Sequence, residues 1–210
     1  MIKNIIFDVG RVLIDWFPHE TMKELGFSDT EIEKVDQILF KSGEWKEEDL
    51  SLRTPQEMED YFASLAPEYA DKIRLFYRHA VDSAKLRDYS IPFIDELKKS
   101  GYKTYILSNF GQEKKESLEQ KGVFRFLKHT DGYLFSYELH KIKPAPEIYE
   151  ELLKKYNLNA SECVFIDDVI ENVNGAQNVG IIGIQFNTIE QVCDDLNSFY
   201  VNFKRDFLRK

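Results

Sequence analysis

The feature that most constrains the fold is a series of short apolar runs, several of which do not alternate with polar residues. A strand with one solvated face alternates, whereas a strand of a parallel sheet is covered by helices on both faces and stays apolar throughout. The runs therefore predict the strands of a buried parallel sheet. They lie at residues 2–7, 103–107, 132–135, 163–166 and 181–185.

Helical patterns separate the later runs. The segments 91–100, 146–156 and 170–179 are expected to be helices, and the first and the third are each followed by a glycine, which commonly ends a helix. Strand and helix alternate from about residue 89 onward. This alternation predicts an α/β fold with a doubly wound parallel sheet.

The stretch 16–87 breaks the alternation, because its patterns at 30–40, 55–66 and 68–84 are helical and none predicts a strand. We therefore predict a core domain of residues 1–15 and 88–210 with an inserted helical domain of residues 16–87. Ligands of doubly wound folds bind at the carboxyl ends of the strands. An insertion that leaves from that edge is expected to cover the site as a lid.

Polar residues follow four of the predicted strands, and the carboxyl ends of parallel strands lie at one edge of a sheet. Taken alone, each is ordinary: an aspartate after a strand is usually a turn residue, and a loop lysine is usually solvated and supplies little stability. Taken together, they are expected to converge on one site. They are Asp8, Ser108, Asn109, Lys143, Asp167 and Asp168.

These side chains fit phosphoryl chemistry. Adjacent aspartates at a buried strand end repel each other and need a cation, and carboxylates are the hard oxygen ligands that suit Mg²⁺. A lysine with Ser and Asn donors is suited to hold a phosphoryl group. A carboxylate aimed at phosphorus can act as a nucleophile and form an aspartyl-phosphate.

Four segments resemble, in order, the motifs of the haloacid dehalogenase (HAD) superfamily of hydrolases. They read "FDVGRVL", "LSN", "KPAPEIY" and "VFIDDVIENVNGAQNVG". The resemblance implies a Rossmann-like core with an inserted helical cap domain of the first type (subfamily I, C1 cap). The fourth segment is similar to the small phosphatases that include bacterial α-D-glucose-1-phosphate phosphatase and the N-terminal phosphatase domain of soluble epoxide hydrolase.

The resemblance implies a role for each site residue. Asp8 is expected to be the catalytic nucleophile, and Lys143 to bridge it to the phosphate. Ser108, Asn109 and Lys143 are expected to bind the phosphoryl group. The implied metal is Mg²⁺, with Asp8, the backbone carbonyl of Gly10 and Asp168 as ligands. Behind these ligands, Asp167 is expected to orient Lys143, and Asn172 to hold a metal-bound water.

Gly10 departs from the pattern of the family, whose phosphatases mostly carry a second aspartate there that protonates the leaving group. Three explanations are open. The subgroup that resembles the glucose-1-phosphate enzyme also reads "DLGN", so glycine is compatible with activity there, and a sugar 1-phosphate has a comparatively good leaving group that needs less acid. Alternatively, water or a cap residue such as Asp15, His19 or Glu44 supplies the proton. Dehalogenases of the superfamily also lack this acid but need no metal, so the Asp167–Asp168 pair favours a phosphatase. A dehalogenase-type hydrolase or a weakly active or non-catalytic phosphate-ester-binding protein stays the alternative.

The composition of the chain limits the kinds of binding partner and the location that we expect. The net charge of -9 over 210 residues argues against nucleic acid or an anionic membrane as a partner. The carboxylate set, its expected lid and the resemblance imply a small phosphorylated metabolite as the partner, and we expect a monomer or homodimer. No apolar run approaches membrane-spanning length, and Lys3-Asn4 interrupts the N-terminus too early for a signal peptide. We therefore expect a cytoplasmic protein with reduced cysteines at 163 and 193.

Overall fold

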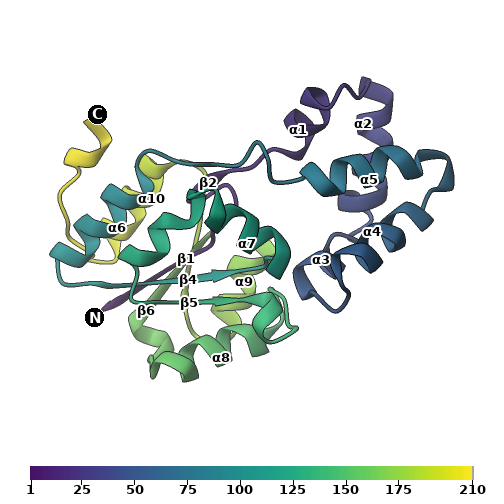
Figure 1. The fold of residues 1–210 in the computed structure, drawn as a ribbon. Helices are drawn as coiled ribbons and strands as arrows, with labels where there is room; N and C mark the ends of the chain where they lie inside the picture. Colours follow the sequence, from purple (N-terminus) through teal and green to yellow (C-terminus); the bar gives the residue numbers. More distant parts are fainter. Residues whose placement is uncertain (210) are drawn as a thin grey trace.

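The computed structural model describes residues 1–209. Within them, the central sheet has five parallel strands in the order β5-β4-β1-β6-β7, with helices on both faces (Figure 1). The predicted α/β class with a parallel sheet is therefore confirmed. The strands are β1 (Asn4–Phe7), β4 (Lys103–Ser108), β5 (Gly132–Phe135), β6 (Cys163–Asp167) and β7 (Ile182–Gln185).

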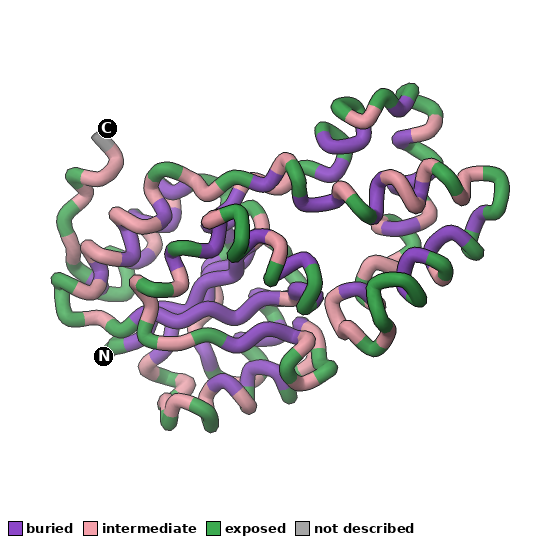
Figure 2. The backbone as a smooth tube through the Cα atoms, in the orientation of Figure 1, coloured by how far each residue is buried: buried purple, intermediate pink, exposed green. Residues whose placement is uncertain are grey.

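Strand β1 lies at the centre of the sheet, paired with β4 on one side and β6 on the other. All four of its residues are buried (Figure 2). Ile5 and Phe7 pack in the core beneath α6 and α10, whereas Ile6 packs on the opposite face against α8 and α9. These helices are α6 (Ser90–Lys99), α8 (Pro146–Tyr156), α9 (Ile170–Asn178) and α10 (Ile189–Ser198), and α7 (Gln112–Gln120) follows β4. Burial on both faces explains why these runs do not alternate.

The region between β2 and β3 is helical and has its own apolar core, built around Phe62, Phe76 and Leu39. Figure 1 shows it as a lobe beside the sheet. The predicted boundaries of the core domain and the inserted helical domain remain a prediction. The helices are α1 (Pro18–Glu24), α2 (Asp29–Asp36), which continues into a π-helical turn (Gln37–Lys41), α3 (Lys46–Leu50), α4 (Pro55–Ser64) and α5 (Ala70–His79).

One sequence prediction about this region is wrong. Residues 16–87 were expected to hold no strand, but β3 (Lys85–Leu86) pairs antiparallel with β2 (Ile14–Asp15). Each strand has only two residues, which is too short to produce a periodic pattern. The pair joins the two chain crossings between the sheet and the helical region, and Arg87 Nε donates to Asp15 Oδ1 at 2.8 Å across it.

The remaining features are brief. Short 3₁₀ turns occur at Pro67–Tyr69, Val123–His129, Ser136–Glu138, Ala160–Glu162 and Asp206–Arg209. Cys163 and Cys193 are buried and form no disulfide. Near the C-terminus, Phe207 stacks on Phe93 of the core, with 5.1 Å between ring centroids. None of the helices in residues 1–209 combines the length and the apolarity needed to cross a bilayer.

Candidate active site

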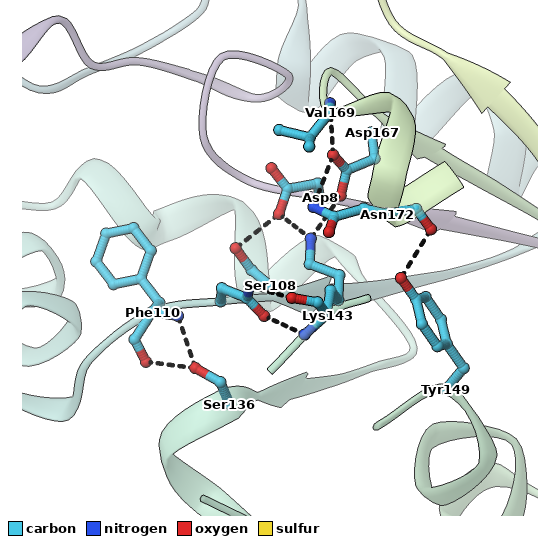
Figure 3. Close-up of polar contacts among 10 residues, drawn as sticks. Asp8, Ser108, Phe110, Ser136, Lys143, Tyr149, Asp167, Val169 and Asn172 are labelled. Atoms are coloured by element: carbon cyan, nitrogen blue, oxygen red, sulfur yellow. Dashed lines mark hydrogen bonds and ion pairs between the residues drawn. The ribbon is translucent and has the colours of Figure 1, made fainter. Parts of the chain in front are cut away.

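Asp8 comes directly after β1 and lies at the carboxyl edge of the sheet. Its Oδ1 accepts a hydrogen bond from Ser108 Oγ at 2.8 Å and one from Lys143 Nζ at 2.6 Å (Figure 3). Its Oδ2 accepts no hydrogen bond from any residue in 1–209. One oxygen of this buried carboxylate is thus held in place, and the other is available to a ligand.

Lys143 is not the solvated loop lysine that its position before a proline suggests. Its side chain is only 1% exposed, and Nζ lies 2.6 Å from both Asp8 Oδ1 and Asp167 Oδ2. Its backbone is also fixed, because Lys143 N donates to Asn109 Oδ1 at 2.8 Å and Asn109 Nδ2 donates to Lys143 O at 3.0 Å. The lysine therefore forms a rigid link between the ends of three strands.

This use of Asn109 limits its expected role. Both ends of its side-chain amide are bonded to the backbone of Lys143. A contact between Asn109 and a phosphoryl group therefore has to come from its backbone N–H unless this pair of bonds opens. Ser108 remains at the site through its hydroxyl, which touches Asp8.

Asp167 is fully buried and its oxygens are occupied. Besides Lys143, it accepts hydrogen bonds from Val169 N at 2.8 Å and from Asn172 Nδ2 at 3.1 and 3.2 Å. Asp168 is more open, with Arg11 Nη1 3.9 Å from its Oδ2. Of the two aspartates, Asp168 is therefore the one with free ligand capacity, and Asn172 bonds directly to Asp167.

Close packing of α9 supports this arrangement. Tyr149 of α8 donates to the backbone oxygen of Asn172 at 2.7 Å. A Cβ at Gly175 would lie 2.7 Å from the backbone oxygen of Pro144, a distance at which something must shift. A glycine at 175 therefore allows α9 to lie directly against the loop that carries Lys143.

The carboxylates of Asp8, Asp167 and Asp168 each offer an oxygen within 4.8 Å of the others. Burial, followed by Asp167 and Asp168, raises the pKa of Asp8 to about 7, although Lys143 opposes the shift. The pKa of Lys143 is raised overall by the two carboxylates that it contacts, which keeps it charged. Three carboxylates share one buried ammonium, so the cluster lacks positive charge, and its all-oxygen donor set fits a hard divalent cation.

A cavity of about 600 Å³ opens over this cluster. Residues of the sheet edge form one side of it, and residues 16–49 of the helical region form the other. From the sheet it is lined by Asp8, Gly10, Ser108, Asn109, Lys143, Asp167, Asp168 and Asn172, so the structure brings together all the predicted site residues.

The acid–base candidates named from the sequence fare differently. Asp15 pairs with Arg87, Glu44 accepts from Tyr61 Oη at 2.5 Å, and neither lines the cavity. His19 does line it, with Nε2 2.8 Å from Asp36 Oδ1.

The sequence analysis did not name five of the charged residues on the cavity wall: Arg11, Glu20, Lys23, Asp36 and Asp49. Arg11 follows Gly10 directly, and its nearness to a predicted metal ligand is a signal that could have identified it. Asp49 lies in the acid-rich run "EWKEEDL". Nothing local distinguishes it from its neighbours, because its place in the cavity depends on how the helical region meets the sheet.

Comparisons with known proteins agree with this chemistry. A family model described as a haloacid dehalogenase-like hydrolase matches residues 2–180. The chain is 30% identical over 195 residues to a D-ribitol-5-phosphate phosphatase of Bacteroides thetaiotaomicron, covering 86% of this chain and 89% of the relative. It is 26% identical over 198 residues to a sesquiterpene phosphatase of Aspergillus oryzae, covering 92% and 94%.

Among solved structures, a HAD-family enzyme from Bacteroides thetaiotaomicron in complex with magnesium and inorganic phosphate superposes with a TM-score of 0.71. The alignment covers 91% of this chain and 99% of the other at 24% identity. At that identity the match establishes a shared fold, and nothing about the ligand passes to this chain from it.

Proposed function

Because the chain belongs to the haloacid dehalogenase-like hydrolases and is a phosphoric monoester hydrolase, we propose that it requires Mg²⁺ and cleaves a small phosphomonoester, a sugar phosphate, through an aspartyl-phosphate on Asp8. The observation that carries the proposal is the contact of Lys143 Nζ with both Asp8 and Asp167 at 2.6 Å. It holds a carboxylate rigidly at the cavity with a cation beside it.

In the proposed reaction, an oxygen of Asp8 attacks phosphorus and the bond from phosphorus to the alcohol oxygen breaks. Lys143 and Ser108 hold the nucleophile, and the lysine offsets the negative charge that two anions bring together. Water then attacks the aspartyl-phosphate, which releases inorganic phosphate and restores the carboxylate. Arg11, on the cavity wall, adds a second cation to this side of the site.

Asp8, Asp168 and the backbone carbonyl of Gly10 are the groups that would hold Mg²⁺. When bound, the ion supplies charge neutralisation for the phosphoryl oxygens. Asp167 has no free oxygen for it, because both are hydrogen-bonded. Its part is to fix Lys143 and the start of α9.

The shape and lining of the cavity support a small substrate. Its wall combines the aromatic rings of Trp16, Phe17, Phe40 and Phe110 with polar groups such as His19. The polar groups suit sugar hydroxyls, and a relative named for D-ribitol 5-phosphate points the same way. The apolar portion of the wall makes a terpenyl phosphate the compound to compare, since another relative is named a sesquiterpene phosphatase.

The test is a panel of substrates measured with Mg²⁺ and with EDTA. It contains D-ribitol 5-phosphate, glucose 1-phosphate, farnesyl phosphate, a nucleotide and 2-chloropropionate. We expect phosphate release from a sugar phosphate that falls to background with EDTA and returns with Mg²⁺. Halide release that ignores EDTA would identify the dehalogenase alternative, and no turnover of any compound would leave a phosphate-ester-binding protein.

Asp8→Asn is the matched variant for this panel. It should lower phosphatase turnover by more than about 10⁴-fold, because an amide cannot form the aspartyl-phosphate. Acid-quenched wild-type enzyme should carry phosphate on the peptide that contains Asp8, as measured by mass spectrometry. Asp71→Asn, an exposed change on α5, serves as the control. An Asp8→Asn protein that still turns over would rule out this nucleophile.

A further inference from the structure

We infer that Asp49 of α3 is the acid–base group of this site and takes the place of the second aspartate that Gly10 does not provide. The inference rests on the proposed phosphatase function. It assigns a catalytic role to a side chain of the helical region, which the motifs along the sheet edge do not reveal.

Helix α3 is held against the core at its C-terminal end. Ser136 Oγ donates to the backbone oxygen of Asp49 at 2.6 Å, and His140 Nδ1 donates to that of Leu50 at 2.8 Å. Figure 1 shows α3 on the side of the helical lobe that faces α7 and the end of β5. The backbone of Asp49 is thus anchored to the core domain that also carries Asp8.

The closeness of this contact depends on a glycine. A Cβ at Gly111 would lie 2.5 Å from the backbone oxygen of Glu48 and 2.5 Å from its Oε1. Only a residue without a side chain at 111 lets α3 sit this near to the core. Glu48 is itself fixed, because Tyr77 donates to its carboxylate at 2.8 Å.

The Asp49 side chain lies at the cavity and has no structural partner among residues 1–209. Asp49 lines the same cavity as Asp8, Ser108 and Lys143. It accepts no side-chain hydrogen bond and forms no ion pair within residues 1–209, yet Lys143 and Asp8 lie near enough to influence its charge. A partly buried carboxyl group without a partner, facing a reaction centre, is available for proton transfer.

The other acids on the cavity wall are less suitable. Asp36 is held by His19 at 2.8 Å and by Lys41 at 3.1 Å. Glu20 is exposed to solvent, whereas Asp49 is partly buried. Asp49 is the remaining carboxyl group of the helical region on this wall.

The surroundings of Asp49 also favour the protonated form. Burial is the main cause that raises the pKa of Asp49 to about 8; the charges of Glu48 and Asp8 add to it, and Lys143 opposes them. At neutral pH the group therefore carries a proton that it can donate. After donation, the carboxylate is a stronger base than an ordinary aspartate.

The proton balance over one turnover is closed. As Asp8 bonds to phosphorus and the ester bond breaks, Asp49 gives its proton to the leaving oxygen, and the alcohol departs neutral. The Asp49 carboxylate then takes a proton from the water that attacks the aspartyl-phosphate. Phosphate leaves, Asp8 is a carboxylate again, and Asp49 is protonated again.

The test compares leaving groups in the Mg²⁺-loaded enzyme. The value of kcat/KM reports the steps up to release of the alcohol. Asp49→Asn should therefore lower kcat/KM by about 10²-fold or more on D-ribitol 5-phosphate. On p-nitrophenyl phosphate, whose leaving group needs no acid, it should lower kcat/KM by less than about threefold. On p-nitrophenyl phosphate kcat should still fall, since the water loses its base. Glu47→Gln, on the same helix and paired with Arg53 away from the cavity, should match wild type on both.

A second-site substitution that supplies a new acid distinguishes a catalytic role of Asp49 from a structural one. A Cβ at Gly10 meets only Asp8 Oδ2, at 3.9 Å, so Gly10→Asp can be accommodated. The double variant Gly10→Asp/Asp49→Asn should have a kcat/KM on D-ribitol 5-phosphate at least about tenfold higher than that of Asp49→Asn alone, because general acid catalysis contributes about 10²–10⁴-fold.

Equal loss on both substrates without rescue would mean that Asp49 only shapes the site, and wild-type rates in Asp49→Asn would overturn the inference directly. Either result leaves the proposed function intact as long as Asp8→Asn is inactive. If the wild-type enzyme itself releases no phosphate, it is the proposed function that has failed.

Discussion

Lys143 forms ion pairs with the two buried carboxylates of Asp8 and Asp167, and its removal would leave both without a counter-charge. Lys143→Met should lower the free energy of unfolding by about 3–5 kcal/mol, the usual cost of breaking a buried ion pair on one side. It should also lower kcat by about 10²–10³-fold, because the phosphoryl charge loses a fixed donor. Urea denaturation and steady-state kinetics measure the two effects.

The control for this prediction is Lys141→Met, two residues earlier and exposed, which should change neither quantity. Adding Asp167→Asn to Lys143→Met removes one of the two unpaired charges, so part of the lost stability should return while activity stays low. A Lys143→Met protein with wild-type stability would show that the ion pairs contribute nothing net, as happens for some buried pairs.

Among individual residues, the sequence identifies those whose position is set by the end of a strand. Asp8 and Asp167 each stand at the end of an apolar run, so their meeting follows from a parallel sheet alone. The sequence could not show that both ends of the Asn109 amide hold the backbone of Lys143. That contact joins residues 34 positions apart through loop geometry, which no periodicity encodes.

Among the elements, those with long periodic patterns were predictable. The helix expected at 146–156 is α8, with the same bounds, and the run at 132–135 is β5. The helix expected at 30–40 instead ends its α-helical part at Asp36 and continues as a π turn. Hydrogen-bond slippage inside a helix leaves the apolar spacing almost unchanged, so the pattern cannot report it.

The close approach of α3 to the core gives a prediction at this scale. Gly111→Ala should push α3 outward, because the added Cβ would lie 2.5 Å from backbone and side-chain oxygens of Glu48. Gly111 has an ordinary φ of -73°, so alanine itself is not strained there. We expect kcat/KM on D-ribitol 5-phosphate to fall by about 10-fold or more as the acid moves from the leaving group.

On p-nitrophenyl phosphate the Gly111→Ala enzyme should keep most of its kcat/KM, which distinguishes a displaced acid from a damaged nucleophile. Gln112→Ala changes the next residue, whose side chain bonds Glu116 on the surface, and is the control. Unchanged kinetics on both substrates would mean that α3 has room to adapt without moving Asp49.

The whole molecule divides the site between two parts with different sequence signals. The sheet edge supplies the proposed nucleophile, the lysine and the carboxylate cluster, all of which follow strands and match recognisable motifs. The helical region supplies the opposite wall, including Trp16, Phe40 and Asp49. Its residues reach the cavity only through the docking of one part on the other, so the sequence predicted a lid but not its chemistry.

A carboxyl group kept without a partner should cost stability, and the cost should depend on pH. The pKa of Asp49 is about 8 in the folded protein against an ordinary value of 3.8. Between about pH 4 and 8 the folded protein therefore holds a proton that the unfolded chain has lost, so this group makes the folded state less stable as pH rises. Above pH 8 the penalty is complete.

Asp49→Asn removes that penalty while keeping the shape of the side chain. Its melting temperature should exceed that of the wild type by a margin that is smallest at pH 5 and grows by several degrees up to pH 8.5, because the wild type loses stability through this range. Asp8, whose pKa is also raised, is present in both proteins, so the difference between them contains the cost of the Asp49 charge and its repulsion with Asp8. Thermal melts from pH 5 to 9 provide the measurement, with Glu47→Gln as the control.

Parallel curves for wild type and Asp49→Asn would mean that Asp49 is ionised in the folded protein and cannot serve as the acid. Curves that diverge with rising pH would show that the protein gives up stability to keep a proton donor near the proposed nucleophile.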